Sequence, residues 1–271
     1  MNLSNENVIH VIDGEVEYLQ FRKLLEYPEI RHAFGIKPLD YRAHGESKDV
    51  PEAYAKLFKS VGLNYNSLVR PGQKHTNNVL VINEKENSDA PDFALDYLDN
   101  VDGLITNKSN ITLATTNADC IVLLIYDPVK KVIASVHSGW RGTFKKISKV
   151  VIQKMKEEFE CNPQDIIVCI CPSIRACHFE VEDDVKEMCE SIFDKYEWFK
   201  DVIKKGEIKE EKQKYFIDTV LITKKLLEEE GVLLNNIFDS GVCSVCSSEK
   251  IHSRRADGAE FGLGAGVIGI V

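Results

Sequence analysis

The feature that most constrains the fold is a pair of apolar segments joined by a short polar turn. Residues 121–126 and 131–137 are strand-like, and the residues Asp-Pro-Val-Lys at 127–130 form a tight turn with proline at its second position. So short a connection predicts an antiparallel hairpin. In the register that this turn sets, Cys120 and His137 are directly opposed, about 4.5–5.5 Å apart on one face.

Other periodic segments surround this hairpin. Together they favour an α/β (α+β) fold, a single compact domain over residues 1–271 with mixed β-sheets and helices packed outside, because strands and helices mix without a repeat or a linker. Further strands are predicted at 78–82, 111–116, 165–171 and the C-terminus, helices at 50–62, 143–159, 181–193 and 219–230, and an exposed polar segment at 84–99.

Charge and cysteine content exclude several classes of function. The net charge of −9 over 271 residues gives no basic face for nucleic acid. No apolar run is long enough to span a membrane, and the N-terminus lacks the pattern of a signal peptide, so a cytoplasmic location is expected. In such a chain the 8 cysteines are expected to be free thiols or metal ligands rather than disulfides.

Cys120 and His137 are the kinds of ligand that zinc prefers and that also suit copper. The segment Gln-Lys-His at 73–75 precedes a predicted strand and offers His75 as a third ligand, with Gln73 on the same face if the chain is extended. Three protein ligands and one open position describe a catalytic zinc. The alternative is that Cys120 is a core thiol and His137 a buried histidine, and the spacing does not decide between them.

The residues after His137 suggest an anion site. Gly139 and Gly142 permit close backbone approach, and Gly142 leads into the predicted helix at 143–159 beside Arg141. The alternative is a glycine-rich turn with a solvated arginine and Trp140 in the core.

Several motifs resemble the laccase-domain family, formerly described as multicopper polyphenol oxidoreductases and now as purine nucleoside phosphorylases. QKH (73–75), ADC (118–120) and HSGWRG (137–142) match the family's QxH, ADC and HxGWRG in order and rough spacing. Further similar segments are CPSIRACHFEVEDDV (171–185), YFID (215–218) and CSVCSSEKIHSRR (243–255), so the resemblance runs from about Arg31 to the C-terminus.

The resemblance implies a zinc site of His75, Cys120 and His137, with copper as an alternative metal. It also implies phosphorolysis of adenosine, inosine and methylthioadenosine to free base and ribose 1-phosphate, and deamination of adenosine by hydroxide that the zinc supplies at purine C6. The expected partners are therefore small molecules, with no nucleic acid and no membrane, and the chain is expected to be a monomer or a homodimer.

Beyond the metal ligands, Arg141, Arg254 and Arg255 are predicted to hold phosphate, and Gln73 to contact substrate. Asp119 is expected either to support the ligand Cys120 or to accept a proton, and the alternative is a carboxylate at a strand edge. Weaker candidates are His178, Glu180 and His44.

This chain also departs from the family pattern. Phe179 replaces the usual Tyr, Cys171 a Gly and Val122 a Pro, and Leu263 stands where an Arg is usual. The segment 33–48 lacks the common Arg-Gly-Gly. These changes spare the metal ligands but bear on substrate range and rate.

Rival functions remain open. One is a cysteine hydrolase or deamidase with Cys120 as nucleophile and His137 as base, including an enzyme that edits peptidoglycan precursors. Another is a copper-binding polyphenol oxidoreductase or a copper-handling protein. Cys243 and Cys246, with Cys169, Cys171 and Cys177, would then form a separate soft-metal site, although core thiols are the expectation there.

Overall fold

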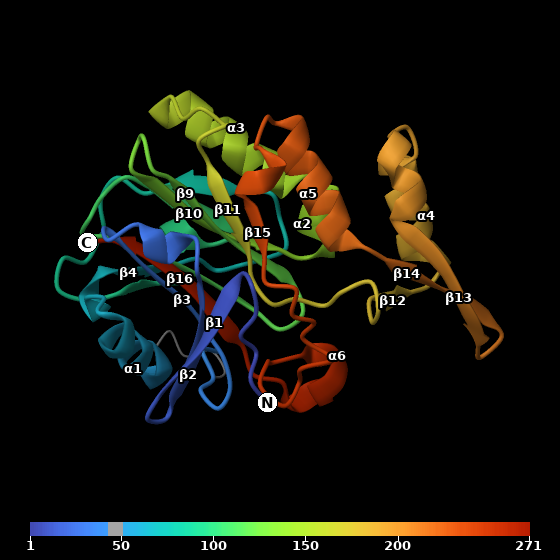
Figure 1. Cartoon of the computed structure of the whole chain (residues 1–271), viewed down its shortest axis with the longest axis horizontal. Coiled ribbons are helices and arrows are strands. Elements are labelled where there is room, and N and C mark those ends of the chain that lie inside the picture. The colour runs from blue at the N-terminus through green and yellow to red at the C-terminus, as the bar shows by residue number, and fades with distance from the viewer. Residues whose placement is uncertain (43–50) are drawn as a thin grey trace.

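The computed structural model describes residues 1–42 and 51–271, and it contains two large mixed β-sheets, a small third sheet and surrounding helices (Figure 1). In order across the seven-stranded sheet lie β1 (Val8–Asp13), β2 (Val16–Phe21), β3 (Ile30–Gly35), β16 (Gly264–Ile270), β8 (Thr112–Asn117), β4 (Leu68–Arg70) and β6 (Asp92–Phe93). The six-stranded sheet has β15 (Ile237–Asp239), β11 (Ile167–Ile170), β9 (Ile121–Asp127), β10 (Val132–Ser138), β7 (Gly103–Thr106) and β5 (Val79–Val81). The third has β12 (Glu180–Val181), β14 (Lys212–Ile217) and β13 (Ile203–Lys209).

The α-helices lie around these sheets. They are α1 (Glu52–Val61), α2 (Trp140–Phe144), α3 (Ile147–Phe159), α4 (Asp183–Phe193), α5 (Thr219–Glu229) and α6 (Arg254–Asp257). Helices α3 and α5 lie over the sheet that contains β9 and β10, whereas α1 lies below the other large sheet (Figure 1). Helix α4 and the third sheet form an arm at one side (Figure 1). The mixed α/β fold class is thus confirmed, while the assignment of residues 1–271 to a single domain stays a prediction.

Strand β9 shows why its sequence is apolar at every position. Leu124 and its alternate neighbours face the seven-stranded sheet, in a core that includes Leu113 and Ile268. Leu123, like Ile121 and Ile125, faces the opposite way, against Val151 and other side chains of α3. Because side chains alternate along a strand, a strand covered on both faces has to be apolar throughout.

The predicted hairpin exists, but its register is wrong by two residues. Strand β10 pairs with β9 so that His137 lies opposite Val122. The connection has four residues, 128–131, because the Asp127 carboxylate accepts the N–H groups of Val129 and Lys130 and Asp127 itself stays within β9. A shift of two keeps every side chain on its predicted face, whereas a shift of one would have reversed them all.

The predicted helix at 143–159 is two helices. Lys146 has a φ of +62° and separates α2 from α3. The break allows Phe144 to pack against Phe193 of α4, while Ile147 packs toward the six-stranded sheet. One straight helix would not direct both side chains to these separate clusters.

The segment 84–99 is only partly the exposed excursion that its polarity predicts. Asp92 and Phe93 are buried and add β6 to the edge of the seven-stranded sheet. The Asp92 carboxylate is satisfied by N–H groups of Glu86 and Asn87 and by the Tyr97 hydroxyl. Among the described residues, none of the helices has the length and apolar character needed to cross a membrane.

Candidate functional site

The three predicted metal ligands meet at one point at the end of the β9–β10 hairpin. Ligand atoms of His75, Cys120 and His137 all lie within 4.8 Å of one another, and the His75 Nε2 is 3.8 Å from the Cys120 sulfur. His137 is the buried member, Cys120 is half-buried and His75 is exposed. The two imidazole rings meet edge to face, with centroids 4.9 Å apart. One soft sulfur and two nitrogens in this arrangement form a donor set suited to zinc or copper.

Asp102, which precedes β7, orients this cluster and was missed by the sequence reasoning. Its buried carboxylate lies 2.7 Å from the Nδ1 of His137 and accepts backbone N–H groups of His75 and Thr76 at 3.0 and 2.7 Å. The Thr76 hydroxyl and the Lys74 N–H also donate to it. Because Nδ1 of His137 is taken by Asp102, its Nε2 is left for the site.

In the sequence, Asp102 is marked only by being a lone carboxylate directly before β7. Strand β7 is short and was not predicted. Strand β7 pairs antiparallel with β10, with Gly103 opposite Val136, and this pairing brings Asp102 to His137. The His137 N–H also donates to the Asp102 carbonyl at 2.7 Å.

The charges in this cluster are strongly coupled. Burial raises the pKa of Asp102, but hydrogen bonds from His137 and Thr76 outweigh it and lower that pKa to about 2. Burial lowers the pKa of His137, and bonds to Asp102 and Cys120 more than reverse this, to about 9. The pKa of Cys120 is raised by burial and lowered by His137 and His75, with a net value of about 6. The site thus favours a thiolate, which is the form that binds metal or attacks an electrophile.

Gly139 explains how the HSGWRG segment passes so close to the ligands. A Cβ at this position would lie 2.4 Å from Cδ2 of His75 and 3.2 Å from the Cys120 sulfur. Only glycine therefore leaves His75 in its place. The following helix α2 has five residues, fewer than the long helix on which the predicted anion site depended.

Two adjoining cavities open on this cluster. The larger, of about 710 Å³, is lined by Trp140 and Phe179 as well as by charged side chains. The smaller, of about 290 Å³, extends toward Phe261. His75 and Cys120 line both, so the ligand cluster lies at their junction. The larger volume is in the range of small-molecule sites.

Comparison with known proteins identifies the family. A family model described as multi-copper polyphenol oxidoreductase laccase matches residues 34–271. The chain belongs to this family. It is 34% identical to a purine nucleoside phosphorylase of Clostridium acetobutylicum over 84% of this chain and 95% of that protein. It is 29% identical to adenosine deaminase RL5 of an unknown prokaryotic organism, over 92% of this chain and 96% of that one.

Two further comparisons describe extent and fold. The chain spans about half, 47%, of the length of the human purine nucleoside phosphorylase LACC1, to which it is 29% identical over 82% of its own length. The crystal structure of YlmD from Geobacillus stearothermophilus superimposes with a TM-score of 0.83 at 22% identity, covering 97% of this chain and 99% of that chain. This likeness supports the mixed α/β fold.

The family motifs also supply cations to the cavities. Arg141, Arg254 and Arg255 line the larger cavity together with Lys74, and their binding of phosphate stays a prediction. Arg141 stacks on Trp140 with its guanidinium carbon 4.1 Å from the ring centroid. Two guanidinium nitrogens of Arg255 donate to the carbonyls of His178 and Glu180, so this arginine also holds the cavity wall.

Two arginines outside the sequence motifs, Arg42 and Arg70, line the smaller cavity with Arg254. Arg42 and Arg254 approach the ring of Phe261, and Arg70 stacks on Phe93. Neither arginine belongs to a motif, although Arg70 lies three residues before Gln73, and nothing in the local pattern indicates that either one reaches the site.

The structure favours one of the alternatives left open for Asp119. Its carboxylate accepts the hydroxyls of Ser244 and Ser253 and the N–H of Arg255, all within 2.8 Å. These contacts join Asp119 to the start of α6, which carries Arg254. Asp119 therefore supports the site rather than standing free to accept a proton.

Three other candidates are placed differently from the predictions. The side-chain amide of Gln73 is occupied by the backbone of Thr116, as donor at 2.8 Å and as acceptor at 2.8 Å, so it braces the loop although it lines the smaller cavity. Neither His178 nor Glu180 lines either cavity, and Glu180 pairs with Lys209 at 2.6 Å. His44 lies outside the described residues.

Proposed function

We propose that this chain is a zinc-dependent purine nucleoside enzyme. It would cleave adenosine, inosine and methylthioadenosine with phosphate to free base and ribose 1-phosphate, and would also deaminate adenosine. The observation that carries the proposal is the cluster of His75, Cys120 and His137 at the junction of two cavities, with Asp102 orienting His137. The names of the relatives, a purine nucleoside phosphorylase and an adenosine deaminase, support the substrate class.

The donor set fits zinc. His75, Cys120 and His137 would hold the ion, and Asp102 fixes the tautomer of His137 that such binding needs. When bound, zinc supplies a Lewis acid that lowers the pKa of water and polarises polar groups of a substrate. Copper is the alternative metal for the same ligands.

The larger cavity offers surfaces for each part of the substrates. Trp140 and Phe179 present aromatic faces suited to a purine base, and Arg141, Arg254 and Arg255 present cations suited to phosphate. In phosphorolysis a phosphate oxygen forms a bond to ribose C1′ while the C1′–N9 bond breaks and the base leaves with a proton. The arginines would hold the phosphate on the side of C1′ away from the base.

A cysteine hydrolase remains the second candidate, including a deamidase or an enzyme that edits peptidoglycan precursors. The observation that favours it is the sequence of contacts from Cys120 to His137 to Asp102, which resembles a nucleophile, base and orienting acid. Zinc binding would occupy the thiolate that this mechanism needs. Metal content therefore separates the two candidates.

The deciding experiment replaces Cys120 with Ala and uses Cys161→Ala as the control, because Cys161 is a buried core thiol outside the cluster. Zinc per chain and adenosine turnover are measured with and without phosphate, and adenine and inosine are separated by chromatography. We expect Cys120→Ala to lose one zinc ion per chain, and we expect the rates of both reactions to fall at least about 100-fold. Wild-type turnover in metal-free protein would refute zinc dependence.

We also propose a cytoplasmic location and a monomeric or homodimeric state. All eight cysteines are free thiols, which suits a reducing compartment.

A further inference from the structure

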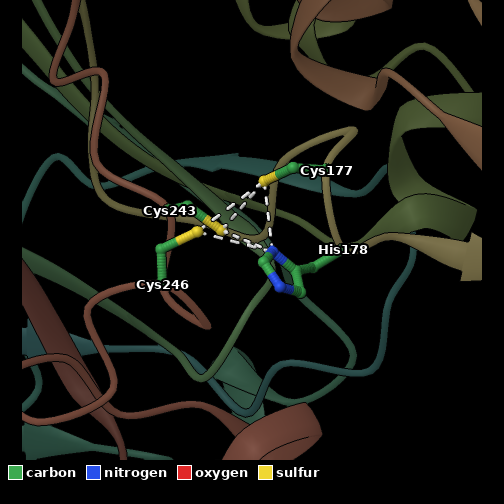
Figure 2. A group of neighbouring side chains, drawn as sticks. All are labelled: Cys177, His178, Cys243 and Cys246. Carbon is green, nitrogen blue, oxygen red and sulfur yellow. Dashed lines mark hydrogen bonds between the residues drawn. The ribbon is translucent and has the colours of Figure 1, made fainter.

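Four potential metal ligands gather at a second place, outside both cavities. Cys177 and His178 come from the segment between β11 and β12, and Cys243 and Cys246 from the segment after β15. Figure 2 shows the three sulfur atoms turned toward one ring nitrogen of His178. Cys169 and Cys171, grouped with them in the sequence analysis, instead lie in the apolar core.

The distances among these atoms match a tetrahedral ion. With zinc–sulfur bonds of about 2.3 Å and zinc–nitrogen bonds of about 2.05 Å, tetrahedral ligands are separated by about 3.8 Å between sulfurs and about 3.6 Å between sulfur and nitrogen. The Cys177 sulfur is 3.6 Å from that of Cys243 and 3.9 Å from that of Cys246. Nδ1 of His178 is 3.2, 3.7 and 3.5 Å from the sulfurs of Cys177, Cys243 and Cys246.

A backbone turn places Cys243 and Cys246 on the same side of the segment that follows β15. The Ser247 N–H donates to the Cys243 carbonyl at 3.0 Å and closes the turn of the Cys-x-x-Cys segment.

The two ligand-bearing segments are held in register by other contacts. Ser173 forms a parallel bridge with Cys243, and the Ser244 N–H donates to the Ser173 carbonyl. The Arg175 guanidinium forms two hydrogen bonds with the Asp239 carboxylate, at 2.9 and 2.7 Å. The ligands are therefore preorganised by the fold on two chain segments far apart in sequence.

We propose that Cys177, His178, Cys243 and Cys246 bind a second zinc ion with a structural role. Three cysteines and one histidine complete a four-coordinate shell and leave no position for a substrate. Four ligands in tetrahedral spacing suit zinc better than copper(I), which binds thiolates with fewer ligands. The sulfur separations are far longer than the about 2.05 Å of a disulfide bond.

The position of this site indicates what it stabilises. The first segment continues into Phe179, which lines the larger cavity, and the second continues into Arg254 and Arg255, which line it too. Arg255 also donates to the carbonyl of the ligand His178. The second zinc would therefore fasten one wall of the cavity without touching the substrate.

The test counts zinc in the untagged full chain, purified with a reductant and measured by inductively coupled plasma mass spectrometry. We expect two zinc ions per wild-type chain, one in Cys120→Ala, one in Cys246→Ser and none in the double variant. Cys161→Ser serves as the control and should keep two. A single wild-type zinc that Cys120→Ala removes completely would overturn the proposal, and so would a disulfide among Cys177, Cys243 and Cys246 in non-reducing mass spectrometry of the freshly purified protein.

A second measurement begins with the wild-type chain, whose folding no substitution affects. Cobalt(II) substituted into the wild-type chain should show the strong sulfur-to-metal charge-transfer absorption of a three-thiolate site, and Cys120→Ala should remove only the smaller part of it. His178→Cys should keep the second ion, whereas His178→Ala should release it at least tenfold faster to a chelator. Equal release from both His178 variants would count against a histidine ligand and overturn the proposed set. Nucleoside turnover reports separately on the first site. A chain without turnover could still bind the second zinc ion, so failure of the proposed activity would leave the zinc count at the second site unchanged.

Discussion

Replacing Asp102 with Asn should weaken both the fold and the first metal site. The Asp102 carboxylate accepts two donors on one oxygen, from His75 and His137, and three on the other, from Lys74 and Thr76. An Asn amide nitrogen cannot accept a hydrogen bond. In the first place it leaves the His75 N–H unpaired, and in the second it leaves the N–H groups of Lys74 and Thr76 unpaired. One or two lost hydrogen bonds at about 1–3 kcal/mol each predict a loss of about 1–6 kcal/mol in the free energy of unfolding.

The same change should lower zinc affinity through His137. If the amide nitrogen of the introduced side chain donates to Nδ1 of His137, the ring proton moves to Nε2, the atom left to bind metal. A loss of this kind of support costs about 10–100-fold in metal affinity. Affinity is measured by competition with a fluorescent chelator, and stability by urea denaturation.

Asp92→Asn is the matched control. Asp92 is also buried and also accepts several hydrogen bonds, but it lies in β6, at the edge of the other large sheet. We expect Asp92→Asn to lower the free energy of unfolding by an amount comparable to that of Asp102→Asn, and to leave zinc affinity unchanged. Zinc affinity of Asp102→Asn within about twofold of wild type would refute the role assigned to Asp102.

Three further predictions concern other parts of the molecule. Gly139→Ala places a Cβ 2.4 Å from Cδ2 of His75, so zinc affinity by chelator competition should fall at least about tenfold, and unchanged affinity would contradict the geometry. Burial raises the pKa of Asp239, but Arg175 and Lys224 lower it to about 2 overall, so its stabilisation is present above about pH 4 and is lost as the pH falls toward 2. Acid unfolding should show that loss, about 2 kcal/mol, in wild type and not in Asp239→Asn. Leu124→Ala empties a fully buried position between the sheets and should cost about 2–5 kcal/mol in urea denaturation, whereas Val129→Ala in the exposed turn should cost less than about 0.5 kcal/mol. Equal losses of stability in the two variants would contradict the placement of Leu124 between the two large sheets.

Local patterns predicted many of the elements. Pro51 near its start and Gly62 past its end predicted α1, and short strand-like runs bounded by polar residues predicted β8, β9 and β10. The pairing of β1 to β3 was not predicted, because those strands mix polar and apolar residues. The break at Lys146 was also missed, since only packing against α4 separates α2 from α3.

By itself the sequence determined that Cys120 and His137 share a face at the open end of one hairpin, and its motifs added His75. These inferences depend on residues close together in the chain. The two-residue error in the hairpin register does not disturb them, because it leaves each side chain on its predicted face. Only the tertiary structure decided that Asp102 orients His137, that Arg42 and Arg70 reach the smaller cavity, and that Cys177 and His178 meet Cys243 and Cys246. Each of these contacts joins segments far apart in the chain. Strand order and packing set such contacts, and no local periodicity encodes them.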